Sequence, residues 1–347
     1  MQKNRFTSNP KVLVVGGNPV RWSAHERESE RSITNGIEAW VYAFNGDYCT
    51  HKHLTVELVS NYDVVICNSN YFYDESYIMQ YLPVAQKRPQ HVHWVTLLEG
   101  NMLDYVKPTK HIREYLDSSD LINCINRFAT AFIQELTITP VRYVGIPYPV
   151  DGIKALRVQH EQRIRNTFIC PFLLQRWTDY FVAKHLGLPY GGYEEKASRK
   201  LKHVKHNYTK FGTLLNKDVQ VDKVKERYRD TQLTIEYAES LECFFMNKSN
   251  SYLWVNMDER YTWGRYVLDA AALGIPIITT PSTGHGEILF PKTTVAHPFD
   301  IEQAVILGKR LIEDETFYRE VIEYADSGIE LYKPEIIKDK LLQELKK

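Results

Sequence analysis

Polar and charged residues that could bind an anionic ligand are concentrated between Asp258 and Glu287. This stretch reads as a polar segment, a helix over 264–273, a buried strand over 275–280 and a glycine-containing loop. In open α/β sheets, ligands bind at the loops that follow the carboxyl ends of the strands, where backbone N–H groups and helix N-termini are exposed. The loops at the two ends of this helix–strand pair are therefore the first candidates for a binding site.

The segment before the helix has the composition of a helix start. Thr262 is placed to be the N-cap, which predicts that the N–H groups of Trp263, Gly264 and Arg265 are free to meet an anion such as a diphosphate. Asp269 follows Thr262 by about two turns, on the same face, where its carboxylate could accept hydrogen bonds from sugar hydroxyls. The alternative for Asp269 is a capping or ion-pairing role on a surface helix.

A second candidate loop follows the strand and consists of Ser282, Thr283, Gly284, His285 and Gly286. Small residues there would let a ligand approach the backbone. Glu287 opens the next helix, where it would either orient sugar hydroxyls or stabilise the helix dipole. Near the N-terminus a similar turn closes the first strand and would present backbone N–H groups to a ligand; it consists of Gly16, Gly17 and Asn18.

Buried strands and amphipathic helices alternate along the chain, which is typical of a doubly wound α/β sheet. In the first half, continuous apolar runs predict strands over 11–17, 62–67, 93–98, 121–125 and 141–146. After Pro147 and Pro149 the alternation restarts, with strands over 167–170, 252–255 and 275–280 and closing helices over 300–312, 314–325 and 334–346. The pattern predicts two Rossmann-like domains facing a cleft, with C-terminal helices. We place them at 1–150 and 151–330, with a final helix over 331–347 that packs back on the first domain.

The run Ala272–Pro276, the apolar strand, the glycine-rich loop and Glu287 together resemble the C-terminal signature of GT-B nucleotide-sugar glycosyltransferases, especially their large retaining family. Asn126-Arg-Phe after the fourth strand resembles the end of that family's first domain. The resemblance implies a nucleotide-sugar donor, with a UDP- or GDP-sugar expected, bound to the second domain. It implies an acceptor bound to the first domain, with Gly16, Gly17 and Asn18 as the acceptor-binding candidates. It covers about a third of the chain by motif and the rest by architecture.

Carried over residue by residue, the resemblance assigns Asp269 to the ribose of the donor nucleotide. Tyr261 stands where the family has its first glutamate, and Glu99 stands nearest the place of the family's first-domain histidine. The basic pair that neutralises the diphosphate falls near Arg176 and Lys184, with Arg265 as a substitute. Glu99, Arg176 and Arg265 are the catalytic candidates that follow. These departures leave the donor sugar and the stereochemical course open.

The function that the resemblance implies is transfer of a sugar to an acceptor hydroxyl, retaining in stereochemistry and independent of metal, since the sequence has no Asp-x-Asp motif. No other cofactor is expected. A sugar-nucleotide epimerase of the same fold and a non-catalytic nucleotide-binding or scaffold protein are the alternatives. The acceptor is left open among a polysaccharide, a glycolipid, a protein, a small molecule and a modified nucleic acid.

Composition limits the partners further. The 43 Lys and Arg residues balance the 43 Asp and Glu residues, so no overall field recruits nucleic acid or a membrane. Locally, Lys196–Lys210 holds six basic residues and no acid; it could grip an anionic surface, although a solvated basic segment is the commoner explanation. The five scattered cysteines indicate a reducing compartment, and no signal peptide or membrane helix is expected, so the predicted location is the cytoplasm.

Overall fold

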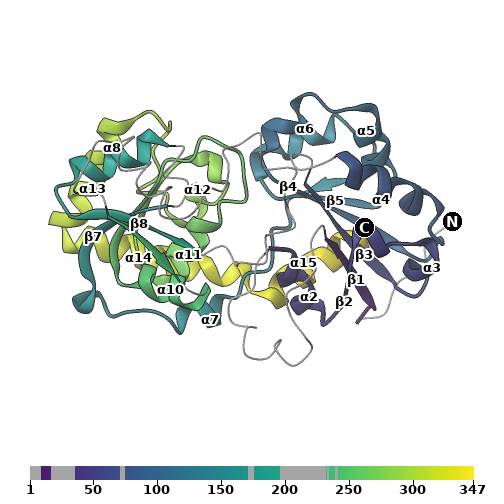
Figure 1. Cartoon of the computed structure of the whole chain (residues 1–347), viewed down its shortest axis with the longest axis horizontal. Helices are drawn as coiled ribbons and strands as arrows, with labels where there is room; N and C mark the ends of the chain where they lie inside the picture. Colours follow the sequence, from purple (N-terminus) through teal and green to yellow (C-terminus); the bar gives the residue numbers. More distant parts are fainter. Residues whose placement is uncertain are drawn as a thin grey trace.

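The computed structural model describes residues 9–16, 36–70, 75–170, 176–195, 232, 234–238 and 241–347. These residues form two α/β lobes, each built around a twisted parallel sheet with helices on its faces (Figure 1). This confirms the predicted fold class. No helix in the part of the chain that the structure describes is long and apolar enough to cross a membrane.

The first lobe contains a six-stranded sheet of order β2-β1-β3-β4-β5-β6, with every neighbouring pair parallel. Its strands are β1 (Val12–Gly16), β2 (Asp47–Thr50), β3 (Val64–Asn70), β4 (His93–Glu99), β5 (Leu121–Cys124) and β6 (Val141–Arg142). The central strands β1, β3 and β4 are mostly apolar because helices cover both faces of the sheet. Val14, Val65 and Val95, for example, are fully buried.

The second lobe contains a five-stranded sheet of order β11-β10-β7-β8-β9, again all parallel. Its strands are β7 (Ile164–Ile169), β8 (Tyr190–Glu195), β9 (Thr234–Ala238), β10 (Ser251–Asn256) and β11 (Ile277–Thr279). Because β10 and β11 are adjacent and parallel, the loops that leave their carboxyl ends emerge at the same edge of the sheet.

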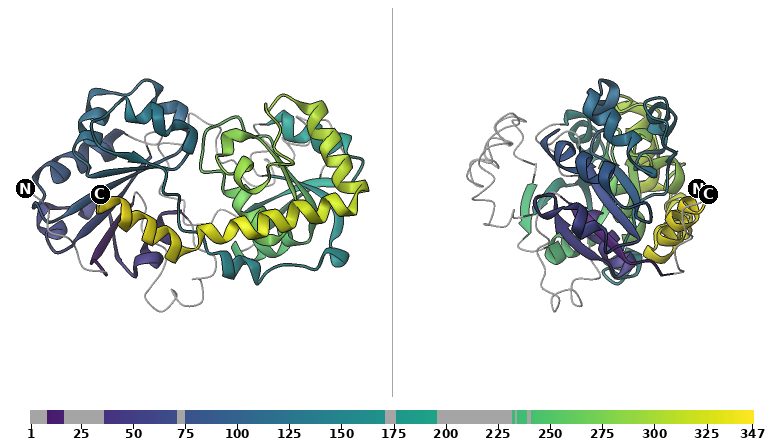
Figure 2. Two further views of the ribbon diagram at one scale, coloured as in Figure 1. Left: turned by 180° about the vertical axis from the view of Figure 1, so that it is seen from behind. Right: turned by 90° about the vertical axis from the view of Figure 1, so that its right-hand side faces the viewer.

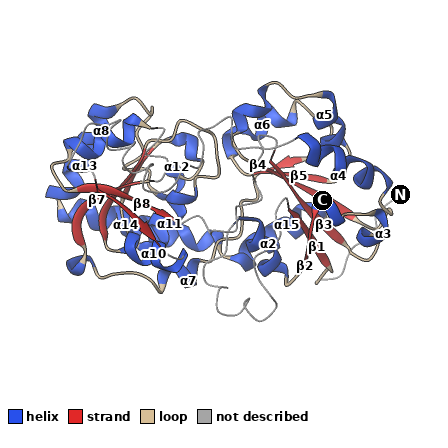
Figure 3. Cartoon of the chain, viewed as in Figure 1, coloured by secondary structure: helices blue, strands red, loops and turns tan. Residues whose placement is uncertain are grey.

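The helices cover both sheets and join the lobes (Figure 3). Those of the first lobe are α2 (Gly36–Phe44), α3 (Val56–Val59), α4 (Glu75–Lys87), α5 (Lys110–Asp117) and α6 (Thr130–Gln134), with 3-10 turns η2 (His51–His53), η3 (Met102–Val106) and η4 (Arg127–Ala129). Those of the second lobe are α7 (Val150–Lys154), α8 (Trp177–His185), α10 (Leu241–Ser249), α11 (Arg265–Leu273), α12 (Gly286–Leu289), α13 (Ile301–Glu313) and α14 (Glu315–Ile329), with turns η5 (His160–Gln162) and η7 (Pro281–Thr283).

The chain ends on the lobe where it began. After α14, the turn η8 (Glu330–Tyr332) leads into α15 (Pro334–Leu345), and these two helices run along the back of the molecule from one lobe to the other (Figure 2). Ile337, Leu341 and Leu342 of α15 are buried in the hydrophobic core of the first lobe. Burial of these side chains fastens the two lobes together, since each fully buried aliphatic side chain contributes about 1.5–3 kcal/mol.

Helix α11 is anchored at its C-terminus by arginines from the start of the second lobe. Gly274 ends it in the left-handed conformation, with φ of 68°. Arg163 donates to the carbonyl oxygens of Leu273 and Gly274, at 3.0 and 2.8 Å, and Arg157 donates to that of Ala272 at 2.6 Å. Cations at this end offset the partial negative charge of the helix dipole. The helix that follows the first candidate loop is therefore rigidly placed.

Several elements had no clear signal in the sequence. Strand β2 (Asp47–Thr50) is a polar edge strand, and β8 contains Gly191 and Gly192, so neither has the apolar run of a buried strand. Helices α4, α5 and α10 also lie outside the predicted set. Strand β9 also lies outside the predicted set. The other strands and the closing helices lie within a few residues of their predicted positions.

Candidate functional site

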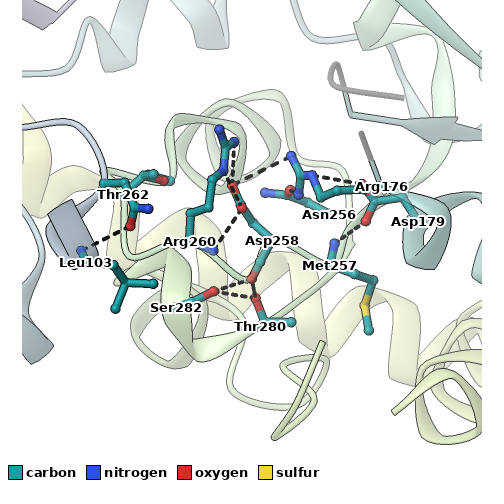
Figure 4. Close-up of polar contacts among 12 residues, drawn as sticks. Leu103, Arg176, Asp179, Asn256, Met257, Asp258, Arg260, Thr262, Thr280 and Ser282 are labelled. Atoms are coloured by element: carbon teal, nitrogen blue, oxygen red, sulfur yellow. Dashed lines mark hydrogen bonds and ion pairs between the residues drawn. The ribbon is translucent and has the colours of Figure 1, made fainter. Parts of the chain in front are cut away.

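Two loops at the carboxyl edge of the second sheet form the centre of the candidate site. The β10 loop is residues 257–264 and the β11 loop is residues 280–287. The hydroxyl groups of Thr280 and Ser282 both donate to the backbone carbonyl of Asp258, and they lie 2.9 Å from each other (Figure 4). The two loops are thus bonded into one unit.

Gly264 brings the two loops into backbone contact. Its φ is +64°, and a Cβ atom at this position would lie 2.2 Å from the carbonyl oxygen of Thr283. Gly264 is also the N-cap of α11, so the prediction that Thr262 is the N-cap was wrong. Instead, the Thr262 hydroxyl accepts from the Gly264 N–H at 3.3 Å. The left-handed turn at Gly264 moves the helix start two residues on, and it uses one of the N–H groups that were expected to be free.

A buried charge cluster lies beneath the β10 loop. Arg176, at the start of α8, is 4% exposed and donates to Asn256 at 2.7 Å; it also approaches Asp179 at 3.5 Å and Asp258 at 3.6 Å. The partly exposed guanidinium group of Arg260 also donates to the Asp258 carboxylate, at 3.0 and 3.2 Å (Figure 4). Although burial opposes its charged form, the two guanidinium groups hold the pKa of Asp258 below its ordinary value. Burial raises the pKa of Asp179 to about 6 in spite of Arg176.

Asp269 lies in a second buried cluster. Its carboxylate accepts from the hydroxyl of Tyr148 at 2.6 Å and contacts Lys248 at 3.3 Å and Arg265 at 3.4 Å. Lys248 is fully buried among aromatic rings, with its nitrogen 4.4 Å from the centre of the Tyr266 ring. Burial lowers the pKa of Lys248 to about 8, although Asp269 opposes the shift. The structure therefore places Asp269 where it holds Arg265 at the start of α11.

Side chains of the first lobe reach directly onto both loops. The amide of Asn126 donates to the carbonyl oxygens of Thr262 at 3.0 Å and Ser282 at 2.7 Å. Arg127 forms an ion pair with Glu287, and the Met102 N–H donates to the Tyr261 carbonyl at 2.8 Å. Asn126 is fully buried. The conformation of the two loops is therefore supported from the opposite lobe.

Glu99 is a carboxylate of the first lobe that lies near this arrangement. It ends β4 and accepts from Asn68 at 2.7 Å through Oε2, while Oε1 is buried and has no hydrogen-bond partner among the described residues. A Cβ atom on Gly36 would lie 3.3 Å from Oε1 and 3.9 Å from the ring of Trp263. Burial raises the pKa of Glu99 above its ordinary value, which the bond from Asn68 partly offsets. Glu99 and the β10 loop thus meet at the start of α2.

The other sequence candidates are distributed around this centre. Tyr261 is 36% exposed, with its ring edge against Phe128, and Trp263 packs against the cores of both lobes. Gly284 has a φ of +74°, and a Cβ there would lie 3.3 Å from the Asn126 amide. His285 is buried beside Tyr143 and Tyr332. Gly16 ends β1 against Tyr48, whereas Gly17, Asn18 and Lys196–Lys210 lie outside the described residues.

Comparison with solved structures identifies proteins with the same two-lobed architecture. An α,α-trehalose 6-phosphate synthase from Burkholderia multivorans superposes with a TM-score of 0.65 at 9% identity, covering 96% of each chain. A sucrose-phosphate synthase from Thermosynechococcus elongatus gives 0.62 at 12% identity, covering 96% of this chain and 97% of that one. An α-glucosyltransferase solved with UDP and DNA gives 0.58 at 12% identity, covering 98% and 100%.

The fold is GT-B. The predicted resemblance is thereby confirmed at the level of architecture. No protein-family model and no curated protein sequence matches the chain. At identities this low the likeness carries the GT-B fold, and the roles of individual residues depend on the contacts described above.

Residues that support the two loops from a distance had little signal in the sequence. Asn126 and Arg127 follow β5 at the carboxyl edge of the first sheet, and this position and the resemblance of Asn126-Arg-Phe to a first-domain ending are the clues that the sequence offers. Tyr148, Lys248 and Tyr332 contact the site from elements far away in the chain. No local pattern could have paired them with Asp269 or His285.

Asn126→Asp is expected to lower the free energy of unfolding by roughly 1–3 kcal/mol, because it leaves the carbonyl groups of Thr262 and Ser282, the latter buried, without their donor. The aspartate still accepts from the Phe128 N–H, as Asn126 does at 3.1 Å, so the local turn is kept. Chemical denaturation measures the effect. Asn101→Asp is the matched control, because the Asn101 side chain accepts from the Leu103 N–H and an aspartate keeps that bond. Equal stabilities of the two variants would contradict this role for Asn126.

Proposed function

We propose that the protein is a glycosyltransferase that moves a sugar from a nucleotide-sugar donor to an acceptor hydroxyl group. The observation that carries the proposal is the meeting of the β10 and β11 loops with Glu99 across the two lobes of a GT-B fold. Similar structures were solved with UDP, UDP-glucose, or UDP and glucose. We infer a UDP- or GDP-sugar as the donor of this chain.

In this proposal the donor nucleotide lies along the β10 loop and the start of α11. Arg265 at the start of α11, with Arg260 on the preceding β10 loop, faces the diphosphate and stabilises the negative charge that grows as the sugar leaves. Asp269 contributes by fixing Arg265, and contact between Asp269 and the ribose remains part of the proposal. The small residues of the β11 loop, from Ser282 to Gly286, provide room for the sugar and its phosphate beside the backbone.

In this proposal Glu99 contacts a hydroxyl group of the sugar or of the acceptor. The bond between the anomeric carbon and the diphosphate oxygen breaks, and a bond to the acceptor oxygen forms, while the acceptor proton passes to the leaving phosphate or to a base. A buried carboxylate with one oxygen that lacks a partner among the described residues is suited to accept a hydrogen bond from a sugar or acceptor hydroxyl. A retaining course without a metal, and an anionic or polymeric acceptor, complete the proposal.

A nucleoside diphosphate is expected to raise the melting temperature. A ligand that binds only the folded protein at 100 times its dissociation constant adds about 2.7 kcal/mol, which corresponds to a shift of several degrees in a protein of this size. Thermal denaturation with UDP, GDP, ADP and dTDP at millimolar concentration measures it. A flat response to all four would contradict a donor site.

A further inference from the structure

The chain crosses between the lobes twice, and the two crossings are bonded to each other. The first crossing is residues 143–149 and the second is residues 330–333. The Tyr148 N–H donates to the Tyr332 carbonyl at 2.8 Å, and Lys333 pairs with Asp151 at 2.9 Å. Gly145, with φ of +99°, allows the close approach, since a Cβ there would lie 3.1 Å from Ile337.

Each crossing is fixed to one lobe at one end. Asn123 of β5 accepts from the Val144 N–H at 3.0 Å and donates to the Gly145 carbonyl at 2.8 Å, which holds this part of the first crossing to the first lobe. Tyr148 and Tyr332, by contrast, are buried in the hydrophobic core of the second lobe. Relative motion of the lobes must therefore be absorbed between Gly145 and Tyr148 and after Tyr332.

Tyr143, which is held to the first lobe, reaches the β11 loop of the second. Its hydroxyl lies 3.2 Å from His285 Nδ1 and 3.4 Å from the Tyr332 hydroxyl, which itself lies 3.0 Å from the same nitrogen. Burial lowers the pKa of His285 to about 3, so the ring is neutral at physiological pH. Burial also raises the pKa of both tyrosines, so their hydroxyls keep their protons. The single lone pair of Nδ1 accepts from one of them, and the other can donate to the neighbouring tyrosine oxygen.

We propose that Tyr143 is a positioning residue that couples closure of the two lobes to the β11 loop, through the hydrogen-bonded group Tyr143–Tyr332–His285. His285 lies between Gly284 and Gly286, which have no side chains, so its ring is the side chain that holds this part of the loop in place. When the lobes separate, Tyr143 leaves this group and the loop loses a support. The conclusion about the loop as a sugar-binding element rests on the proposed function; the closure contact does not.

The Met102 amide offers a direct measure of closure, because its hydrogen bond runs to the Tyr261 carbonyl on the opposite lobe. Hydrogen–deuterium exchange is followed on the ligand-free protein in the peptide that contains Met102. Tyr143→Phe removes one hydrogen bond and is expected to speed exchange of this peptide roughly 2- to 10-fold. Exchange in α13, far from the crossings, is expected to stay unchanged.

Tyr324→Phe is the matched control, since Tyr324 lies half exposed on α14. In this variant the Met102 peptide should exchange at the same rate as in the unmodified protein. Tyr332→Phe is the second variant and should act like Tyr143→Phe. The proposal would be overturned if exchange at Met102 were unchanged in both Tyr143→Phe and Tyr332→Phe. It would also be overturned if exchange in α13 rose equally, since that would indicate general destabilisation.

A kinetic measurement then tests the link to the proposed reaction. With a nucleotide sugar that the unmodified protein turns over, Tyr143→Phe is expected to lower kcat about 2- to 10-fold and to leave KM for the donor nearly unchanged. A rise in KM alone would contradict the positioning role. Absence of turnover by the unmodified protein would count against the proposed function, while the exchange result at Met102 would still decide the closure contact.

Discussion

Glu99→Gln is expected to lower turnover of a nucleotide sugar by about 10²–10⁴-fold, because an amide cannot take the acceptor proton and a positioned base usually contributes this much. Glutamine can still accept the hydrogen bond that Asn68 donates at 2.7 Å, so the side chain should keep its place. Steady-state release of the nucleoside diphosphate measures the effect. Glu57→Gln, an exposed glutamate on α3, is the control and should have full activity.

The same substitution is expected to raise the stability of the protein at neutral pH. Burial raises the pKa of Glu99 above its ordinary value of 4.5, so the folded protein binds this proton more tightly than the unfolded chain. The resulting stabilisation is present below about pH 4.5 and is lost as the pH rises through the raised pKa. Glutamine has no charge to bury, so its advantage should be largest near about pH 7 and should vanish near about pH 4.

Melting temperatures of the two proteins across this pH range measure the difference. A stabilising substitution that removes activity is the pattern expected of a residue kept for function. If Glu99→Gln were destabilising at neutral pH and fully active, Glu99 would be a structural residue and its place in the site would be wrong.

Gly264→Ala is expected to lower both the stability of the protein and its affinity for nucleotide, because it would separate the β10 and β11 loops. A Cβ atom at this position would lie 2.2 Å from the Thr283 carbonyl oxygen, a backbone atom that cannot rotate away. The left-handed conformation adds a cost of about 1–3 kcal/mol for a residue with a side chain. We expect a fall in nucleotide affinity of about tenfold or more, which corresponds to about 1.4 kcal/mol.

Gly187→Ala separates the effect of the left-handed backbone from that of the contact with Thr283. Gly187 has φ of +76°, but a Cβ atom there would have no described atom within 4 Å, so alanine meets the backbone strain without the contact. Denaturation and nucleotide titration of both variants give the comparison. Gly264→Ala should lose more stability than Gly187→Ala and should alone lose affinity. Equal losses of stability with unchanged affinity would show that the contact between the loops has no role in binding.

The sequence predicted the architecture because the strands of a doubly wound sheet are short, apolar and buried on both faces. Val12–Val15 and Val64–Cys67 could be predicted as strands for this reason, whereas the polar edge strand β2 could not. The β10 and β11 loops could be found as candidates because they follow such strands. The N-cap of α11 was misplaced because Thr262 is the better capping residue by type, and the left-handed turn at Gly264 depends on contact with Thr283.

The supporting residues depend on tertiary structure, and for this reason they could not be predicted. Tyr148 and Asp269 are 121 positions apart, and Asn126 and Ser282 are 156 positions apart. The first contact exists only after the second lobe has folded, and the second only after both lobes have formed and met. The buried position of Asp269 between Lys248 and Arg265 likewise follows from the packing of α10 on the sheet, which the polar sequence before it did not indicate.

Hydrogen–deuterium exchange with and without nucleotide sugars is the measurement that bears most directly on a donor held between the two loops and Glu99. UDP-sugars and GDP-sugars are added in excess, and exchange is followed in peptides covering 257–269, 280–290 and 97–103. We predict that one class of donor slows exchange in all three segments and leaves α13 unchanged. Binding that protects other segments, or no protection by either class, would contradict the proposed site.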